Sequence, residues 1–399
     1  MPEEAPSYHT GGAAEVAAPE SGWRMDRRVE RPTTRIVGPI RPRDQREEHH
    51  TRAAIGELGP VVQKRWTSES VDPLRRIFFP EGRPQNVPHR SWRNVADGPV
   101  APERVEVRNP ARMAEIVKGV ATWLGADLVG VCELDRAFVF THHGLRIDFH
   151  KGRAGQPIEL RHRYAISLAI EMEHANFRNS PSFVDGAAVG KGYMESSKLA
   201  VCMAAYIREL GWPAKAHSFM NEDVLHVPIA VMAGIGELAR NGSIITRRFG
   251  PRVRLATVTT DLPLAVDQPV DIGVQDMCGM CNKCAVNCPA QCIPHGDKVV
   301  VNNVEKWQID NDKCMTYWVA NRERFNDCAR CITVCPWNLP DTRLARVLTW
   351  GIPRWRWWRR AFVWLDDLRR GKKPNPPQDW LYYKVPGDRS TWTIPKIIE

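Results

Sequence analysis

Apolar residues recur at helical intervals in two segments of the chain. In residues 110–124 they fall three or four positions apart, which predicts a helix with one buried face. Residues 196–210 carry the strongest helical pattern, and Gly211 and Pro213 mark where that helix ends. The chain is long enough for two or three domains around at least one sizeable core.

Shorter apolar runs predict strands next to these helices. Residues 126–132 indicate a short buried strand, residues 164–172 a second helix and strand, and residues 185–193 are a glycine-rich stretch. Helices and strands that alternate in this way are typical of a layered α/β or α+β domain.

Composition divides the chain into four regions. Residues 1–75 are rich in Pro, Gly, Glu and Arg without a sustained period, which indicates disorder or an arm that wraps the surface. Residues 76–270 are globular in pattern, residues 271–345 hold most of the cysteines, and residues 346–399 are rich in Trp and Arg. The last region is compatible with contact to a membrane surface, with the wall of an aromatic pocket, or with packing of a C-terminal element.

Charge and hydropathy restrict the expected cellular location and the expected binding partners of the protein. The chain has 399 residues, of which 43% are hydrophobic, and its apolar runs are too short to span a bilayer. Arg27 and Arg28 are followed by Val-Glu-Arg-Pro instead of the apolar run of an export signal, so we expect a cytoplasmic location. The formal charge of +10 is not gathered into one stripe, and we expect no nucleic-acid partner.

The cysteines carry the clearest chemical signal. The run Cys278, Cys281, Cys284 and Cys288 has the spacing C-x2-C-x2-C-x3-C-P. In bacterial ferredoxins this spacing supplies three thiolates to one [4Fe–4S] cluster and the fourth to a second cluster. Two clusters need eight thiolates, and the sequence offers eight between residues 278 and 335 once Cys292 is set aside.

The second set of cysteines is less regular than the first. Cys328, Cys331 and Cys335 keep the C-x2-C-x3-C-P spacing, but the cysteine before them comes early, at Cys314. The crossover rule then assigns two ligand sets. One cluster is held by Cys278, Cys281, Cys284 and Cys335, and the other by Cys288, Cys314, Cys328 and Cys331.

Two other uses of these cysteines were weighed. Paired C-x2-C units also make zinc sites, but the prolines after Cys288 and Cys335 favour iron–sulfur clusters. Disulfides are disfavoured because close cysteines without an export signal suit a reducing compartment. Cys132, Cys202 and Cys292 are interpreted as small buried residues.

Several motifs outside the cysteine region have weak signals. Gly234 and Gly236 fit the G-x-G-x-x-A pattern of dinucleotide-binding turns, yet neither a clear preceding strand nor an acidic ribose partner is present. The two glycines can equally allow close approach of another ligand. The pair at residues 142–143 and the group at residues 171–174 contain histidine, but neither has the spacing of a metal site, so surface or packing roles are expected.

Several ordered segments together resemble the reductive dehalogenases, corrinoid and iron–sulfur enzymes that are in turn similar to epoxyqueuosine reductase. They are residues 205–214 (AYIRELGWPA), 233–242 (AGIGELARNG), 249–255 (FGPRVRL), 260–264 (TDLPL), the cluster cysteines, residues 336–338 (PWN) and residues 365–368 (LDDL). Together they cover about half of the chain.

This resemblance implies an α+β fold, in which a nitroreductase-like corrinoid-binding domain adjoins a ferredoxin-like domain with two [4Fe–4S] clusters. It implies a cobalamin bound base-off, which agrees with the lack of an Asp-x-His-x-x-Gly motif. In this interpretation Gly234 and Gly236 let the backbone approach the corrinoid.

The resemblance also implies an acid–base group. The tyrosine of the family falls at Tyr193, its basic partner at Arg254, and the asparagine found in some members at Asn221. A nearby guanidinium favours the phenolate and so lowers a tyrosine pKa from about 10 towards the working range. Arg252 could supply the same charge, and Arg254 could instead pair with Asp261.

The implied reaction is reductive removal of halide from a small organohalide. Electrons would come from a low-potential donor such as a ferredoxin, a flavodoxin or a reductase, and membrane contact is not predicted. Two alternatives stay open: a tRNA-modifying enzyme like epoxyqueuosine reductase, and a ferredoxin-type electron carrier with an appended domain. The substrate's carbon skeleton, its halogen and the exact corrinoid are not readable from the sequence.

Overall fold

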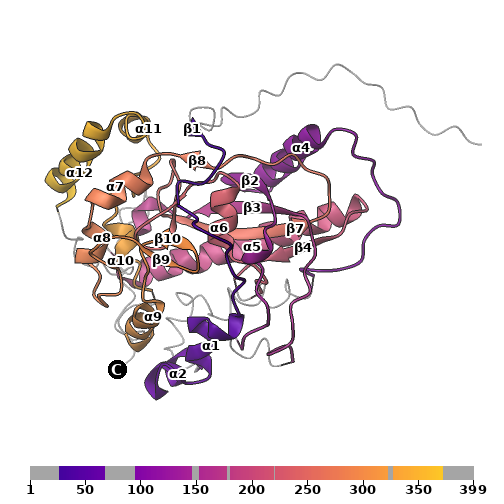
Figure 1. Cartoon of the computed structure of the whole chain (residues 1–399), viewed down its shortest axis with the longest axis horizontal. Helices are drawn as coiled ribbons and strands as arrows, with labels where there is room; N and C mark the ends of the chain where they lie inside the picture. The colour runs from indigo at the N-terminus through magenta and orange to yellow at the C-terminus, as the bar shows by residue number, and fades with distance from the viewer. Residues whose placement is uncertain are drawn as a thin grey trace, which may run out of the picture.

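A four-stranded antiparallel sheet forms the centre of the larger part of the molecule (Figure 1). The computed structural model describes residues 27–67, 95–145, 152–177, 180–219, 221–321 and 327–371. The strands stand in the order β2 (Leu128–Glu133), β3 (Tyr164–Glu171), β7 (Val253–Thr260) and β4 (Ala214–His217).

Helices cover both faces of this sheet. Alternate side chains of the central strands, such as Ile166 and Val258, pack against α4 (Pro110–Trp123) and the long helix α5 (Phe183–Glu209). The intervening side chains, such as Ala165 and Ala169, face α6 (His226–Met232). Because strand side chains alternate between faces, one strand contributes to two cores. The α+β prediction is therefore confirmed.

The helix that carries Tyr193 begins earlier than the sequence pattern indicates. Ser182 and Asp185 form a capping box, in which the Ser182 backbone N–H donates to the Asp185 carboxylate at 2.6 Å. This cap starts α5 at Phe183, so the glycine-rich stretch at residues 185–193 is part of the helix. Residues 164–171 are a single strand, so the second helix expected there is wrong.

The cysteine-rich part is built from short helices and small strand pairs. Its elements are α7 (Val274–Met280), α8 (Lys283–Val286), β9 (Val299–Val301), β10 (Val304–Lys306), α9 (Asn311–Ala320) and α10 (Arg330–Thr333). Two further pairs join it to the sheet domain, β5 (Glu237–Leu238) with β6 (Ile244–Ile245), and β1 (Arg27–Arg28) with β8 (Val270–Asp271).

The described part of the N-terminal arm runs over both parts of the molecule. After β1, a bridge pairs Ile36 with Val304 of β10. The helices α1 (His49–Ala54) and α2 (Pro60–Thr67) then pack against α9 through Trp66 and Met315, at the bottom of Figure 1. The sequence analysis predicted neither helix. Residues 1–26 and the junction at residues 68–94 lie outside the described part.

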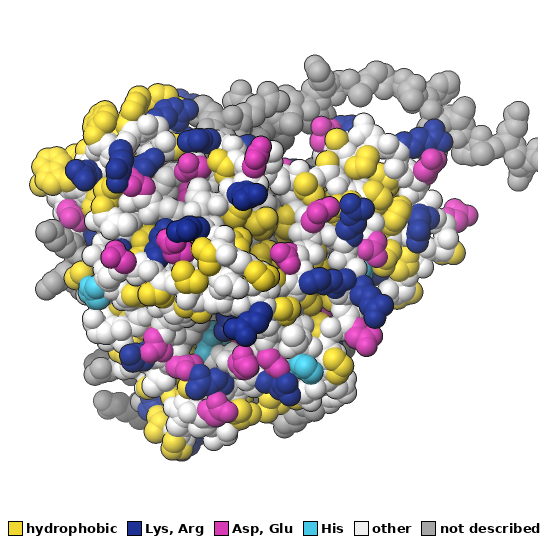
Figure 2. Space-filling view, viewed as in Figure 1, with side chains coloured by type: hydrophobic (Ala, Val, Ile, Leu, Met, Phe, Trp, Pro, Cys, Tyr) yellow, Lys and Arg dark blue, Asp and Glu magenta, His cyan; other side chains and the backbone are white. Residues whose placement is uncertain are grey.

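The Trp/Arg segment folds into α11 (Arg343–Trp350) and α12 (Arg356–Arg370). Its inner side packs on α7 through Phe362 and Trp358. Its outer side exposes Trp357, Trp364 and Leu368, and Figure 2 has hydrophobic side chains beside Lys and Arg at the corner where Figure 1 draws α12. Among the described helices, none is long and apolar enough to cross a membrane.

Short 3-10 turns complete the described elements. They are η2 (Gln45–Glu47), η4 (Arg136–Phe138) and η6 (His174–Phe177). The first leads into α1, and the second lies next to the arm, where Phe138 helps to line a cavity described below.

Candidate active site and cysteine groups

The first group of cysteines gathers around α7 and α8. Cys278 lies in α7, Cys281 follows it, and Cys284 lies in α8. Cys335, after α10, lies next to these three, and Cys278 and Cys335 pack against the same hydrophobic cluster. Residues 57 positions apart are thus brought together by the approach of α10 to α8.

The second group lines a cavity of about 320 Å³. Its members are Cys288, Cys314 of α9, Cys328 and Cys331 of α10, together with Cys292. The two groups adjoin each other, since Cys284 and Cys331 are close enough to interact electrostatically. The structure therefore brings together the residues of each expected ligand set, and the ligand assignment stays a prediction.

The protonation chemistry of these thiols fits a bound metal cluster. Burial raises the pKa of Cys278 and of Cys331 to about 12. Such thiols hold their protons at neutral pH unless a cation displaces them. The iron of a bound cluster would supply that cation, because a coordinated thiol is deprotonated by the metal charge.

Tyr193 and Arg254 meet at the wall of the same cavity. Tyr193 projects from α5 and Arg254 from β7, and the guanidinium carbon lies 4.6 Å from the centroid of the tyrosine ring. The Phe219 ring stacks on Tyr193 with centroids 4.0 Å apart and an interplanar angle of 23°. Asp327 Oδ2 lies 3.7 Å from Arg254 Nη2, so the guanidinium bridges an acidic and a phenolic side chain.

The two alternatives to a Tyr193–Arg254 pair involve Arg252 as the cation and Asp261 as the partner of Arg254. Arg252 is fully buried and is bound to Glu171 at 2.6 Å and to two backbone carbonyls, so it has a structural role. Asp261 accepts the backbone N–H of Arg163 at 2.9 Å, and the carboxylate beside Arg254 is that of Asp327. The geometry thus selects Arg254 over Arg252 as the cation beside Tyr193.

Asn221 and the two glycines do not line this cavity. Asn221 is buried, and its backbone N–H donates to Ser218 at 2.8 Å. A Cβ on Gly234 would meet the Gln268 carbonyl at 2.3 Å, and one on Gly236 would meet the Ile245 carbonyl at 2.2 Å. These glycines are therefore explained by close approach of protein backbone, whereas Gly242 of the same segment does line a cavity.

A second cavity of about 410 Å³ adjoins the first. The two share Asn241, Ile309 and Asn311, and the second is closed on one side by the arm. Its wall combines apolar side chains with the cations Arg41, Arg43 and Lys306. Sequence reasoning missed these arm residues, because the arm has no hydrophobic period that would indicate what it covers.

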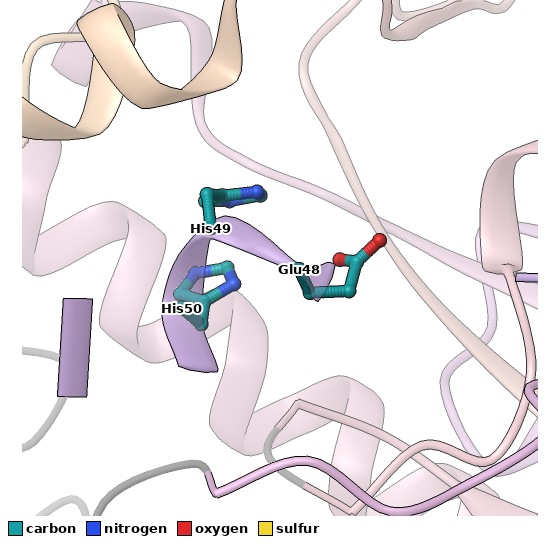
Figure 3. Close-up of side chains that lie close together, drawn as sticks. All are labelled: Glu48, His49 and His50. Atoms are coloured by element: carbon teal, nitrogen blue, oxygen red, sulfur yellow. The ribbon is translucent and has the colours of Figure 1, made fainter. Parts of the chain in front are cut away.

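The start of α1 adds three side chains that the sequence analysis did not consider (Figure 3). The potential ligand atoms of Glu48, His49 and His50 lie within 4.8 Å of one another. Glu48, however, pairs with Arg43 at 3.4 Å, and the two imidazole rings pack with centroids 4.1 Å apart. His49 and His50 line the first cavity, so we interpret them as part of its wall.

The residues present fit a corrinoid as well as iron–sulfur clusters. A large planar cofactor needs an extended, mainly apolar cavity with a few polar groups that fix its orientation. The adjoining cavities provide this, with the amides of Asn241 and Asn311 at their junction. The second cavity also carries the cations Arg41, Arg43 and Lys306, which suit an anionic group.

Comparison with known proteins agrees with this description. Residues 277–339 match the family described as 4Fe-4S dicluster domain, which confirms the prediction of two clusters. The chain is 34% identical to the tetrachloroethene reductive dehalogenase of Dehalobacter restrictus over 282 residues, which are 59% of this chain and 50% of that protein. It is 24% identical over 269 residues to the epoxyqueuosine reductase of Pseudomonas aeruginosa, covering 58% of this chain and 70% of that protein.

The fold is similar to that of a solved catabolic reductive dehalogenase, NpRdhA, in complex with 3-bromo-4-hydroxybenzoic acid. The TM-score is 0.79 at 29% identity, and the match covers 88% of this chain and 49% of that one. A similar structure with the same TM-score is described as suggesting a mechanism for B12-dependent dehalogenation. The resemblance to reductive dehalogenases is thus confirmed, and the chain spans about half the length of the curated relatives it matches.

Proposed function

We propose that this chain, being similar to the reductive dehalogenases in sequence and fold, is a corrinoid-dependent reductive dehalogenase. The observation that carries the proposal is the shared cavity: Tyr193, Arg254 and the second group of cysteines all line it. The net reaction replaces a carbon–halogen bond by a carbon–hydrogen bond, consumes two electrons and one proton, and releases halide.

The cysteine groups supply the route for electrons. The second group opens on the cavity, and the first adjoins it through Cys284 and Cys331. The first group lies beneath α12 at the edge of the molecule, where a low-potential ferredoxin, flavodoxin or reductase would donate single electrons. Two clusters in series can pass two electrons one at a time.

The corrinoid supplies the cleavage of the carbon–halogen bond when it is bound, because that chemistry belongs to the cofactor. The chain's contribution is to hold and orient it. Asn241 and Asn311 would bind its amides, and Arg41, Arg43 and Lys306 would bind the anionic tail. The arm forms one wall of the cavity that holds these cations.

Tyr193 delivers the proton to the carbon that loses its halide. The phenol donates from its hydroxyl oxygen, and the phenolate left behind is stabilised by Arg254, whose guanidinium lies 4.6 Å from the ring. Phe219 holds the ring by stacking, which limits the directions in which the hydroxyl can point. Apolar and aromatic neighbours, including Trp66 and Trp318, suit an apolar organohalide.

Two rival functions make different use of this site. An epoxyqueuosine reductase would use an acidic proton donor, and Asp327 does line the cavity, but it pairs with Arg254. A simple electron carrier would have no need of a proton donor or of the two cavities. Both rivals predict that Tyr193 is dispensable.

The test is halide release by the full chain reconstituted anaerobically with iron, sulfide and cobalamin and reduced with methyl viologen. A chlorinated alkene and a brominated phenol serve as substrates, and ion chromatography measures the halide. We expect release from at least one substrate and a loss of roughly 100-fold or more in Tyr193→Phe. Tyr206→Phe, on the same helix but in the core, serves as the control.

Failure would take one of two forms. A fully loaded protein that releases no halide from either class would contradict dehalogenation of these substrates. Halide release that survives Tyr193→Phe would keep the dehalogenase but remove Tyr193 as the proton donor.

A further inference from the structure

Five cysteines line the first cavity, although a [4Fe–4S] cluster needs four. The fifth is Cys292, which is buried and whose sulfur lies 3.3 Å from the sulfur of Cys288. A sulfur this close can reach the same iron as Cys288 after a small rotation of its side chain. Cys292 therefore differs from an ordinary buried cysteine.

The backbone between Cys288 and Cys292 holds the two thiols together. Gln291 adopts a left-handed conformation with φ of 51° and donates its backbone N–H to the Cys288 carbonyl at 3.1 Å. Its side-chain amide donates to the same carbonyl at 2.7 Å. The Cys292 N–H in turn points at the Cys288 sulfur, 3.5 Å away. These hydrogen bonds within residues 288–292 keep the two thiols close together.

The other side of Cys292 is tied to the helix that carries Cys314. The Asp310 backbone N–H donates to the Cys292 carbonyl at 3.0 Å, and Asp310 is the N-cap of α9. Cys314 lies within that helix and its thiol contacts the thiol of Cys292. Cys292 is therefore held between two members of the expected ligand set.

We propose that Cys292 is a reserve ligand of the second cluster. In the intact protein Cys288 holds one iron, and Cys292 remains a thiol beside it. When Cys288 is missing, the Cys292 thiol gives its proton to solvent and its sulfur binds the same iron, with no change in oxidation state. The proposal rests on the presence of the second cluster and not on the substrate of the enzyme.

In the part of the chain that the structure describes, Cys292 is the spare thiol beside Cys288 and Cys314, and the other two cysteines outside the expected ligand sets lie elsewhere. The remaining cysteines are Cys132, whose sulfur lies 3.7 Å from the Ile229 carbonyl under α6, and Cys202, which is exposed on α5. Neither lines the cavity. Cys328, which has no neighbouring spare thiol, is therefore a matched control for Cys288.

The experiment compares Cys288→Ala, Cys292→Ala, Cys328→Ala and the double variant Cys288→Ala/Cys292→Ala, each reconstituted as the full chain. Iron content and low-temperature electron paramagnetic resonance are measured. We expect about eight irons per chain in the wild type, in Cys292→Ala and in Cys288→Ala. The Cys328→Ala variant and the double variant should lose iron. Their paramagnetic resonance spectra should show either the signal of a three-iron cluster or the signal of the first cluster alone.

Two results would overturn the proposal. Loss of iron in Cys288→Ala to the level of Cys328→Ala would mean that Cys292 cannot replace Cys288. Loss of iron in Cys292→Ala alone would make it a resident ligand. The signal of the first cluster reports folding in every variant. If Cys288→Ala fails to fold, Cys288→Ser is compared with the double variant Cys288→Ser/Cys292→Ala. A lower iron content in the double variant would show that Cys292 binds the second cluster, because only a cluster held by Cys292 is affected by removal of that thiol.

Discussion

The guanidinium of Arg254 lies against the ring of Tyr193, with 4.6 Å between the guanidinium carbon and the ring centroid. Two residues earlier, Arg252 points into the protein and is bound to Glu171 and to the Leu339 carbonyl. Arg254 lies in β7 and Arg252 directly before the strand begins, so their different surroundings come from what each side chain meets at the start of β7. Arg254 lines the first cavity, and Arg252 joins the sheet to the segment after α10.

Replacing each of these arginines by Gln should separate a residue needed for activity from one needed for stability. Arg254→Gln is expected to lower halide release roughly 10- to 100-fold, because the phenolate loses its nearby positive charge, with little change in unfolding temperature. Arg252→Gln should instead destabilise the fold by roughly 3 kcal/mol, because the removal of a buried partner leaves Glu171 and two carbonyls unpaired. Initial rates and thermal unfolding measure both. Equal losses of activity in the two variants, with equal unfolding temperatures, would contradict these different roles.

A methyl group at position 192 should disturb the Tyr193–Arg254 pair. A Cβ there would come within 2.8 Å of Arg254 Cγ, so the arginine must move away from the ring. Gly192→Ala should cost roughly 10-fold in activity while helix propensity favours Ala by about 1 kcal/mol. Gly119→Ala in α4, whose Cβ would meet open space, is the control for propensity. An unchanged rate in Gly192→Ala would show that the contact is not needed.

His217 should make stability depend on pH. It is fully buried between Thr259, at 2.9 Å, and the backbone N–H of Asp223, at 3.2 Å, and burial lowers its pKa to about 3. The unfolded chain takes up a proton near pH 6.5 that the folded state excludes, so stability is complete above that pH. It falls by about 1.4 kcal/mol per unit as the pH drops below it.

The measurement is the unfolding temperature between about pH 7.5 and about pH 5.5. His217→Gln should show a shallower fall than the wild type, because Gln cannot be protonated. His295→Gln, at an exposed position, should keep the wild-type slope. Parallel slopes for the wild type and His217→Gln would assign the acid sensitivity to other groups.

The ion pairs of α12 should protect the first cysteine group. Lys283, between Cys281 and Cys284, binds Asp366 at 2.5 Å and Asp367 at 2.9 Å. Asp366→Ala leaves the buried ammonium with Asp367 as its one carboxylate partner, beside the Gly371 carbonyl, and should destabilise the docking of α12 by roughly 3 kcal/mol. Iron–sulfur absorbance should then bleach several-fold faster in air. Arg360→Ala, exposed on the same helix, should bleach at the wild-type rate; a similar rate for both variants would contradict a protective role.

Local patterns were sufficient where a feature depends on neighbours in the chain. The helix at residues 110–123 and the strand at residues 128–133 were readable because periodicity reports which face of a short segment is buried. The start of α5 was also readable in principle, since Ser182 followed by Asp185 has the spacing of a capping box. The glycines at residues 186–192 obscured it. Cys202 was expected to be buried and is exposed, because a single residue carries no periodicity.

The cysteine spacing was enough to predict the cluster chemistry, because thiolates two or three residues apart can reach a common metal with little help from the rest of the fold. The cation beside Tyr193 could be identified from the folded chain alone, since α5 and β7 meet through the packing of the sheet. The tertiary structure likewise brought the arm over the second cavity and Cys292 against Cys288. Such contacts form because whole helices and strands are buried against one another. The free energy of that packing cannot be inferred from a local pattern along the chain.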